Sequence, residues 1–194
     1  MERRKMNIIF EVWGYEVTLL ELSSVITSLI AVYLGALGIR MVWPWWILSS
    51  FLYAIFFYQV ELFASSFLQI IFILAAIWGL AGWKSTGVEP RYMSFGERVL
   101  WALVLVLTWV VTAPVLAEIG AAASWPDSLL LVSSAIAQFV MVLQRNETWI
   151  LWILIDTFGT WHYLRQELYF TSFLYLIFTF IAVFGLVRWM KIRG

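Results

Sequence analysis

The sequence predicts an all-α integral membrane protein with seven transmembrane helices, in which two parallel three-helix repeats flank one connecting helix. The first observation behind this is composition: 63% of the 194 residues are hydrophobic, 12% are charged, and the formal net charge is zero. A soluble domain of this size could not present such a composition to water. A membrane core of about 30 Å needs roughly 20 apolar residues per helix, so the chain suffices for about seven crossings.

The second observation is an internal duplication. A shift of 106 residues, without a gap, places Trp43 on Trp149 and Trp46 on Trp152. The same shift also matches Glu61-Leu62 with Glu167-Leu168, Ser66-Phe67-Leu68 with Ser172-Phe173-Leu174, Gly79-Leu80 with Gly185-Leu186, and Trp83 with Trp189. The repeat runs from about residue 20 to the C-terminus, and a duplication of this length sets the architecture.

The apolar stretches predict helices over residues 19–38, 42–58, 63–83, 99–117, 129–143, 149–164 and 168–190. Residues 1–18 form an interfacial lead-in, because Glu11 and Glu16 interrupt an apolar run too short for a signal peptide. The expected units are a first bundle (19–84), a cytoplasmic loop (85–98), a linker helix (99–117), a second bundle (127–190) and a tail (191–194). Four helices precede the fifth, so both bundles enter the membrane from the same side.

Basic residues predict the orientation. One face of the membrane collects Arg40, Lys84, Arg91, Arg98, Arg145, Arg188, Lys191 and Arg193, and the other collects Arg3, Arg4, Lys5 and Arg165. Because cytoplasmic loops carry the excess of lysine and arginine, the N-terminus is expected outside and the C-terminus in the cytoplasm. The basic N-terminal cluster argues for the opposite orientation.

Polar side chains at membrane depth are costly and are therefore candidates for function. On the sixth expected helix, Trp149, Trp152 and Asp156 share one face by their spacing. The other candidates are Ser134 and Gln138 on the fifth helix, Trp43, Trp46, Tyr53 and Gln59 on the second, and Gln69 on the third. Aromatic walls, amides and one carboxylate suit a planar, polar, cationic ligand.

Structural roles compete with this interpretation. Tryptophans near helix ends are typical of the membrane interface, and Trp83, Trp125 and Trp189 are assigned there, with Trp43 and Trp149 left open between interface and cavity. Asp156 and Gln138 could instead hydrogen-bond between helices. His162, near a helix end, is assigned to the interface.

Catalysis fits the sequence poorly. The chain has one histidine and no cysteine, no metal-ligand cluster, no phosphate-binding loop and no G-x-S-x-G motif. A retinal-binding receptor needs a lysine inside a helix, whereas Lys5, Lys84 and Lys191 all lie at ends. We therefore expect neither an enzyme nor a bound cofactor or metal.

Several motifs resemble the Pnu vitamin transporters. They are W-I-L-W-I-L-I-D (149–156), E-L-Y-F-T-S-F-L-Y (167–175), G-L-V-R-W (185–189), F-Y-Q-V-E-L-F-A (57–64) and L-Q-I-I-F (68–72). The three-one-three layout also looks like that of the SWEET sugar transporters. The resemblance implies facilitated diffusion without ion coupling, trapping of the solute by a cytoplasmic kinase, homotrimers, and a ligand region at Trp149, Trp152, Asp156 and Gln138.

These observations predict a bacterial inner-membrane carrier for a small water-soluble vitamin or precursor. Nicotinamide riboside is the first candidate and thiamine the second, since both are aromatic cations, and riboflavin follows. The aromatic walls would stack on the ring, Gln138 and Gln69 would hydrogen-bond its polar groups, and Asp156 would face the charge or a hydroxyl. The alternatives are a membrane ligand-binding protein that moves no solute and, less favoured by Asp156, a sugar carrier.

Overall fold

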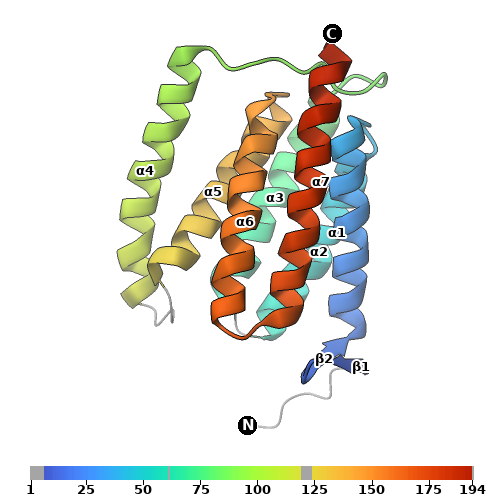
Figure 1. The fold of residues 1–194 in the computed structure, drawn as a ribbon, viewed down its shortest axis with the longest axis vertical. Helices are drawn as coiled ribbons and strands as arrows, with labels where there is room; N and C mark the ends of the chain where they lie inside the picture. Colours follow the sequence, from blue (N-terminus) through green and yellow to red (C-terminus); the bar gives the residue numbers. More distant parts are fainter. Residues whose placement is uncertain (1–6, 61, 119–123, 194) are drawn as a thin grey trace.

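The structure, a computed structural model, describes residues 7–60, 62–118 and 124–193, and within them it contains all seven predicted helices. These are α1 (Leu19–Leu37), α2 (Val42–Gln59), α3 (Phe63–Gly82), α4 (Phe95–Glu118), α5 (Ser124–Val142), α6 (Glu147–Arg165) and α7 (Tyr169–Arg193). Two short strands, β1 (Ile8–Val12) and β2 (Tyr15–Thr18), precede them. The hairpin and the C-terminal end of α7 lie at opposite ends of the helical bundle (Figure 1).

Local hydrogen bonds explain where the helices begin and end. At α1, the Thr18 side chain accepts a hydrogen bond from the Glu21 amide, and Gly38 ends the helix with φ of 75°. Helix α4 begins four residues before the predicted start. There Ser94 and Glu97 form a reciprocal cap, in which each backbone amide donates to the other's side chain at 2.8 and 3.2 Å.

The N-terminal residues add a short β-hairpin to the predicted helical fold. Strands β1 and β2 pair as an antiparallel hairpin, so residues 8–18 are more than a lead-in. Trp13 and Gly14 make the turn with φ of 52° and 77°, as a type I′ turn requires. The hairpin packs on α7 through Trp13 against Phe173 and Tyr15 against Phe170, with ring centroids 6.0 and 5.8 Å apart.

A side-chain hydrogen bond from Tyr15 connects the hairpin to α1. Its hydroxyl donates to the Glu21 carboxylate at 2.8 Å, and Glu21 is 5% exposed. Burial, and then the Glu21 carboxylate, raise the pKa of Tyr15, so the hydroxyl keeps its proton. We expect Tyr15→Phe to cost about 2 kcal/mol of stability, because a buried carboxylate loses its donor. Thermal unfolding in detergent measures this; Tyr33→Phe, on the exposed side of α1, is the control, and equal melting temperatures would contradict the prediction.

Six helices form a closed ring. Helix α1 packs against α2 and α7, α3 lies between α2 and α5, and α6 lies between α5 and α7. Helix α4 packs on α5 at the edge of this ring, as Figure 1 shows. The main buried core fills the ring and includes tryptophans of α2, α6 and α7 together with Trp83.

Five of the described helices, α1, α3, α4, α5 and α7, are long and apolar enough to cross a membrane. The hydropathy of helix α6 is too low for this, because the helix carries Glu147, Asp156, His162 and Arg165. Helix α2 is rich in tryptophan, tyrosine and serine, which lower its hydropathy. The two less apolar helices are those that carry most of the candidate site residues.

Candidate functional site

Aromatic rings from three helices meet inside the ring. Trp46 of α2 lies 6.2 Å from Trp152 of α6, centroid to centroid, and Phe72 of α3 lies 6.4 Å from each. Trp46 and Phe72 are buried. The indole Nε1 of Trp152 is also buried and has no hydrogen-bond partner in the described chain. The structure therefore brings together two of the predicted site tryptophans.

Trp43 and Trp149, which the sequence left open between interface and cavity, are both buried. They are 0% and 1% exposed, and the Nε1 atom of each lacks a partner among the described residues. Each ring lies directly on a glycine: Trp43 on Gly79, and Trp149 on Gly185, where an added Cβ would come within 2.6 Å of the ring. An interfacial ring would reach water with its N–H group, so both tryptophans belong to the interior.

Trp83 and Trp189 correct the assignment to a membrane-interface belt. They are 2% and 0% exposed, and their indole N–H groups donate to backbone carbonyls of other helices. The sequence prediction was wrong because proximity to a helix end does not say which way a ring points. Trp125 is 49% exposed, as a belt residue would be.

Buried amides lie on α5 and at the start of α6. Gln138 is 0% exposed, and neither its Oε1 nor its Nε2 has a partner in the described chain; Ser134, one turn earlier, is 8% exposed. Asn146 is also 0% exposed, and its Oδ1 and Nδ2 atoms have no hydrogen-bond partner in the described chain. Sequence reasoning missed Asn146, which it placed in a loop. Its position just before α6 is typical of a capping residue, yet it makes no side-chain cap.

Asp156 is the buried carboxylate of the region. It is 4% exposed, and no basic side chain of the described residues forms an ion pair with it. The Tyr175 ring of α7 packs on Gly159, one turn further along α6. A desolvated carboxylate without a counter-charge gains from a cationic ligand.

The remaining predicted residues are less clearly grouped. Gln69 is 7% exposed on α3, and Tyr53 is half-buried on α2. Gln59 is exposed at the last residue of α2, so the structure does not bring it to the buried cluster.

His162 lies near the end of α6, as predicted, and its side chain is buried against neighbouring residues. It is 6% exposed; its Nε2 lies 2.9 Å from Asp127 Oδ1 and 2.7 Å from Gln166 Nε2. The ring joins α6 to the start of α5. Its partner Asp127 comes from a distant part of the sequence, so spacing alone could not identify this pair.

The interior thus holds indole N–H and amide groups that are removed from water and from one another. Each such group costs about 1–3 kcal/mol unless something else satisfies it. Amide and indole groups can orient a flat polar ligand by hydrogen bonds while the rings stack on it. Among the described residues there is no group of three or more histidine, aspartate or glutamate side chains suited to a metal ion.

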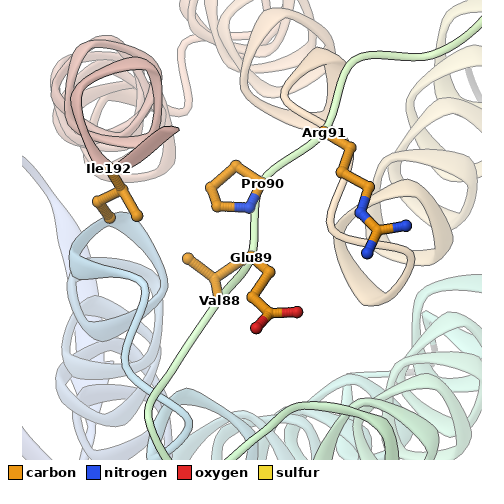
Figure 2. Close-up of a pocket in the computed structure, with 5 residues that line it drawn as sticks. All are labelled: Val88, Glu89, Pro90, Arg91 and Ile192. Atoms are coloured by element: carbon orange, nitrogen blue, oxygen red, sulfur yellow. The ribbon is translucent and has the colours of Figure 1, made fainter. Parts of the chain in front are cut away.

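Two hollows lie at the surface, away from these groups. One, of about 390 Å³, is lined by Trp13 and Tyr169 beside the hairpin. The other, of about 350 Å³, lies where residues 88–91 cross toward the end of α7, and Figure 2 shows Val88, Glu89, Pro90, Arg91 and Ile192 around it. Neither contains the unpartnered indole and amide atoms.

Comparison with known proteins agrees with this arrangement. The family model described as nicotinamide mononucleotide transporter matches residues 18–191. The chain belongs to the nicotinamide mononucleotide transporter family. This confirms the resemblance seen in the sequence motifs and makes the chain a multi-pass membrane protein of a transporter family, not an enzyme.

Two curated members of this family are similar to the chain over much of its length. The nicotinamide riboside transporter PnuC of Escherichia coli (strain K12) is 26% identical, over 92% of this chain and 87% of that protein. The nicotinamide riboside transporter PnuC of Neisseria mucosa is 25% identical, over 75% of this chain and 62% of its own length. A solved crystal structure of the vitamin B3 transporter PnuC has a TM-score of 0.75 at 21% identity and covers 90% of this chain and 81% of its own. The fold is therefore shared within the nicotinamide mononucleotide transporter family.

Proposed function

We propose that this protein is a bacterial inner-membrane carrier that takes up nicotinamide riboside by facilitated diffusion, with trapping of the solute in the cytoplasm. The observation that carries the proposal is the set of buried, unpartnered polar atoms of Trp43, Trp149, Trp152, Gln138 and Asn146 inside the ring. The similarity to nicotinamide riboside transporters over most of the chain supports the same substrate.

The charge of the region favours the riboside over the mononucleotide. A nicotinamide ring that carries a sugar is a flat cation, which suits the tryptophan faces and the unpaired Asp156 carboxylate. A phosphate would need basic partners, and the set of proposed site residues contains neither arginine nor lysine. Gln138 and Asn146 offer donors and acceptors for the amide and the sugar hydroxyls.

The architecture proposed for the carrier follows the repeat. All seven helices cross the membrane, α1 to α3 and α5 to α7 form parallel bundles as in SWEET-like carriers, and α4 links them. The N-terminus lies outside and the C-terminus in the cytoplasm. The bundles rock about the central site to give alternating access. Homotrimer formation is part of the proposal, and α4, with most of its apolar surface exposed, offers area for it.

Calorimetric titration of the purified protein with nicotinamide riboside, nicotinamide mononucleotide, thiamine and riboflavin tests the substrate. We expect nicotinamide riboside to bind, and the mononucleotide to bind at least about tenfold more weakly, because its phosphate must be desolvated without a basic partner. Binding of thiamine in place of the riboside would keep a vitamin carrier and overturn the substrate. Binding of none of the four would overturn the site.

Flux into vesicles separates a carrier from a ligand-binding protein. Protein reconstituted in liposomes should move labelled nicotinamide riboside down its gradient and stop at equal concentrations, without a proton or sodium gradient. Accumulation above equilibrium that depends on an ion gradient would contradict facilitated diffusion. Binding without any flux would leave a receptor or sensor as the function.

A further inference from the structure

Four tryptophans close one end of the ring interior. They are Trp43, Trp83, Trp149 and Trp189, here called the tryptophan quartet, and each is at most 2% exposed. Trp43 packs edge-on against Trp83, with centroids 4.9 Å apart, and Trp149 packs edge-on against Trp189 at 5.5 Å. Trp83 and Trp189 then meet at 5.8 Å. The quartet is a continuous aromatic layer made of two pairs that occupy equivalent positions in the two repeats.

Hydrogen bonds from the quartet cross between the bundles. The indole N–H of Trp83, at the end of α3, donates to the Val142 carbonyl of α5 at 3.2 Å. The indole N–H of Trp189, on α7, donates to the Gly35 carbonyl of α1 at 3.0 Å. Each tryptophan therefore bonds the first helix of the opposite bundle. Bonds that only stabilised a single bundle would not show this reciprocal pattern.

A chain segment covers the same end. Residues 84–94, here called the strap, run between α3 and α4 and bind the turn after the first helix of each bundle. The Val88 amide donates to the Gly38 carbonyl, and the Arg91 amide donates to the Gln144 carbonyl, both at 2.9 Å. Gly38 and Gln144 are themselves 106 residues apart, and both have positive φ, 75° and 59°. The strap thus makes equivalent bonds to the two repeats.

Further contacts hold the strap in place. Arg91 also accepts a hydrogen bond from the Asn146 amide at 2.9 Å, and the Glu89 amide donates to the Gln144 side chain at 2.6 Å. Lys84 pairs with Glu89 at 2.7 Å, which lowers the pKa of the Glu89 carboxylate. Figure 2 shows Val88 to Arg91 crossing between helix ends at this face. A bundle that rocked against its neighbour would have to break bonds on at least one side of the strap.

We propose that Trp83 and Trp189 are gating residues, whose crossed hydrogen bonds under the strap hold this end of the carrier closed and break when it opens. The inference rests on the alternating access proposed above. Because both bonds exist only while the bundles are together at this end, they stabilise the closed state alone. Their loss shifts the population toward a state open at the strap end.

Thiol labelling tests the gate directly, because the chain contains no cysteine. Ala36→Cys provides a reporter beside Gly35 at the strap end, and Ser24→Cys provides one near the hairpin end of the same helix; both positions are 0% exposed. Each is combined with Trp83→Phe and Trp189→Phe, which keep an aromatic ring and remove the N–H donor. The control is Trp109→Phe, which removes a 3.0 Å indole-to-carbonyl bond outside the gate.

We expect maleimide to label Ala36→Cys about tenfold faster in the Trp83→Phe/Trp189→Phe protein, because two hydrogen bonds of the closed state are lost. Ser24→Cys labelling should not rise, and Trp109→Phe should change neither rate. An Ala36→Cys rate equal to that of the Trp109→Phe control would overturn the gate. An equal rise at both reporters would also overturn it, because it would indicate general loosening.

The labelling experiment needs no substrate, so it tests the gate independently of the proposed function. If the unaltered protein binds none of the vitamins, the substrate proposal fails while the labelling rates still decide the gate. Within a functional carrier, the double variant should still bind nicotinamide riboside in calorimetry, since neither tryptophan belongs to the proposed site. Loss of binding together with unchanged labelling would show that the two tryptophans serve the site instead of a gate.

Discussion

Replacement of Asp156 by alanine should weaken nicotinamide riboside binding by at least about a hundredfold, equal to about 3 kcal/mol. The carboxylate is 4% exposed and has no ion-pair partner among the described residues, so a cationic ligand would supply its counter-charge. Asp156→Asn should lose less, because the amide can still accept a hydrogen bond. Calorimetric titration of both variants in detergent measures the two losses.

Thermal unfolding separates this effect from misfolding. Removal of an unpartnered buried charge should leave the melting temperature unchanged or raise it. Asp127→Asn is the matched control: Asp127 already has His162 as a partner at 2.9 Å and is partly exposed, so this variant should keep its affinity for the ligand. Unchanged affinity in Asp156→Ala would remove Asp156 from the proposed site.

Replacement of Gly79 or Gly185 by alanine should destabilise the protein by about 1–3 kcal/mol, the usual cost of forcing an extra carbon into a filled core. At Gly185 the new Cβ would lie 2.6 Å from the Trp149 ring, and at Gly79 it would overlap the Trp43 ring. An indole ring is rigid, unlike a flexible side chain whose last atoms can rotate away, so the whole ring must shift to make room for the new Cβ. Because both rings carry unpartnered N–H groups of the proposed site, weaker ligand binding should accompany the loss of stability.

Gly82→Ala is the control for this pair. It lies on the same helix as Gly79, and an added Cβ there meets nothing within 4 Å. The replacement should be neutral or stabilise the protein by about 0.4–1 kcal/mol, because alanine restricts the unfolded chain. Thermal unfolding and calorimetry of the three variants give the comparison. If Gly79→Ala and Gly185→Ala had the same melting temperature and ligand affinity as Gly82→Ala, the close contacts between glycine and tryptophan would contribute to neither stability nor binding.

Much of the fold could be predicted because it depends on local pattern. The seven helices follow from runs of apolar residues, and most predicted ends lie within a few residues of those observed. Helix α4 begins four residues early because the Ser94 and Glu97 cap extends it beyond its apolar part, and α5, predicted from residue 129, begins five residues early at Ser124. The hairpin was missed because its turn, Trp13-Gly14, places a tryptophan at positive φ, where asparagine or aspartate is usual.

The candidate site could be predicted only in part. Trp152, Asp156 and Gln138 were found because polar and aromatic groups at helical spacing are conspicuous in an apolar sequence. Asn146 was missed because it stands outside the apolar stretch. Its backbone N–H donates to the carbonyl of the strap residue Arg91, whereas its side-chain amide has no partner in the described chain, and neither fact can be read from the local sequence.

The sequence by itself determined the membrane class, the seven helices, the 106-residue repeat and the family, because composition, periodicity and motif matches are properties of the chain alone. Only the tertiary structure decided which tryptophans face the interior. Trp83 and Trp189 stand at helix ends like belt residues, yet each bonds to the backbone of a helix far away in the sequence. Hydropathy measures how apolar a residue is, whereas the direction of a ring is set by the packing of segments that lie far apart in sequence.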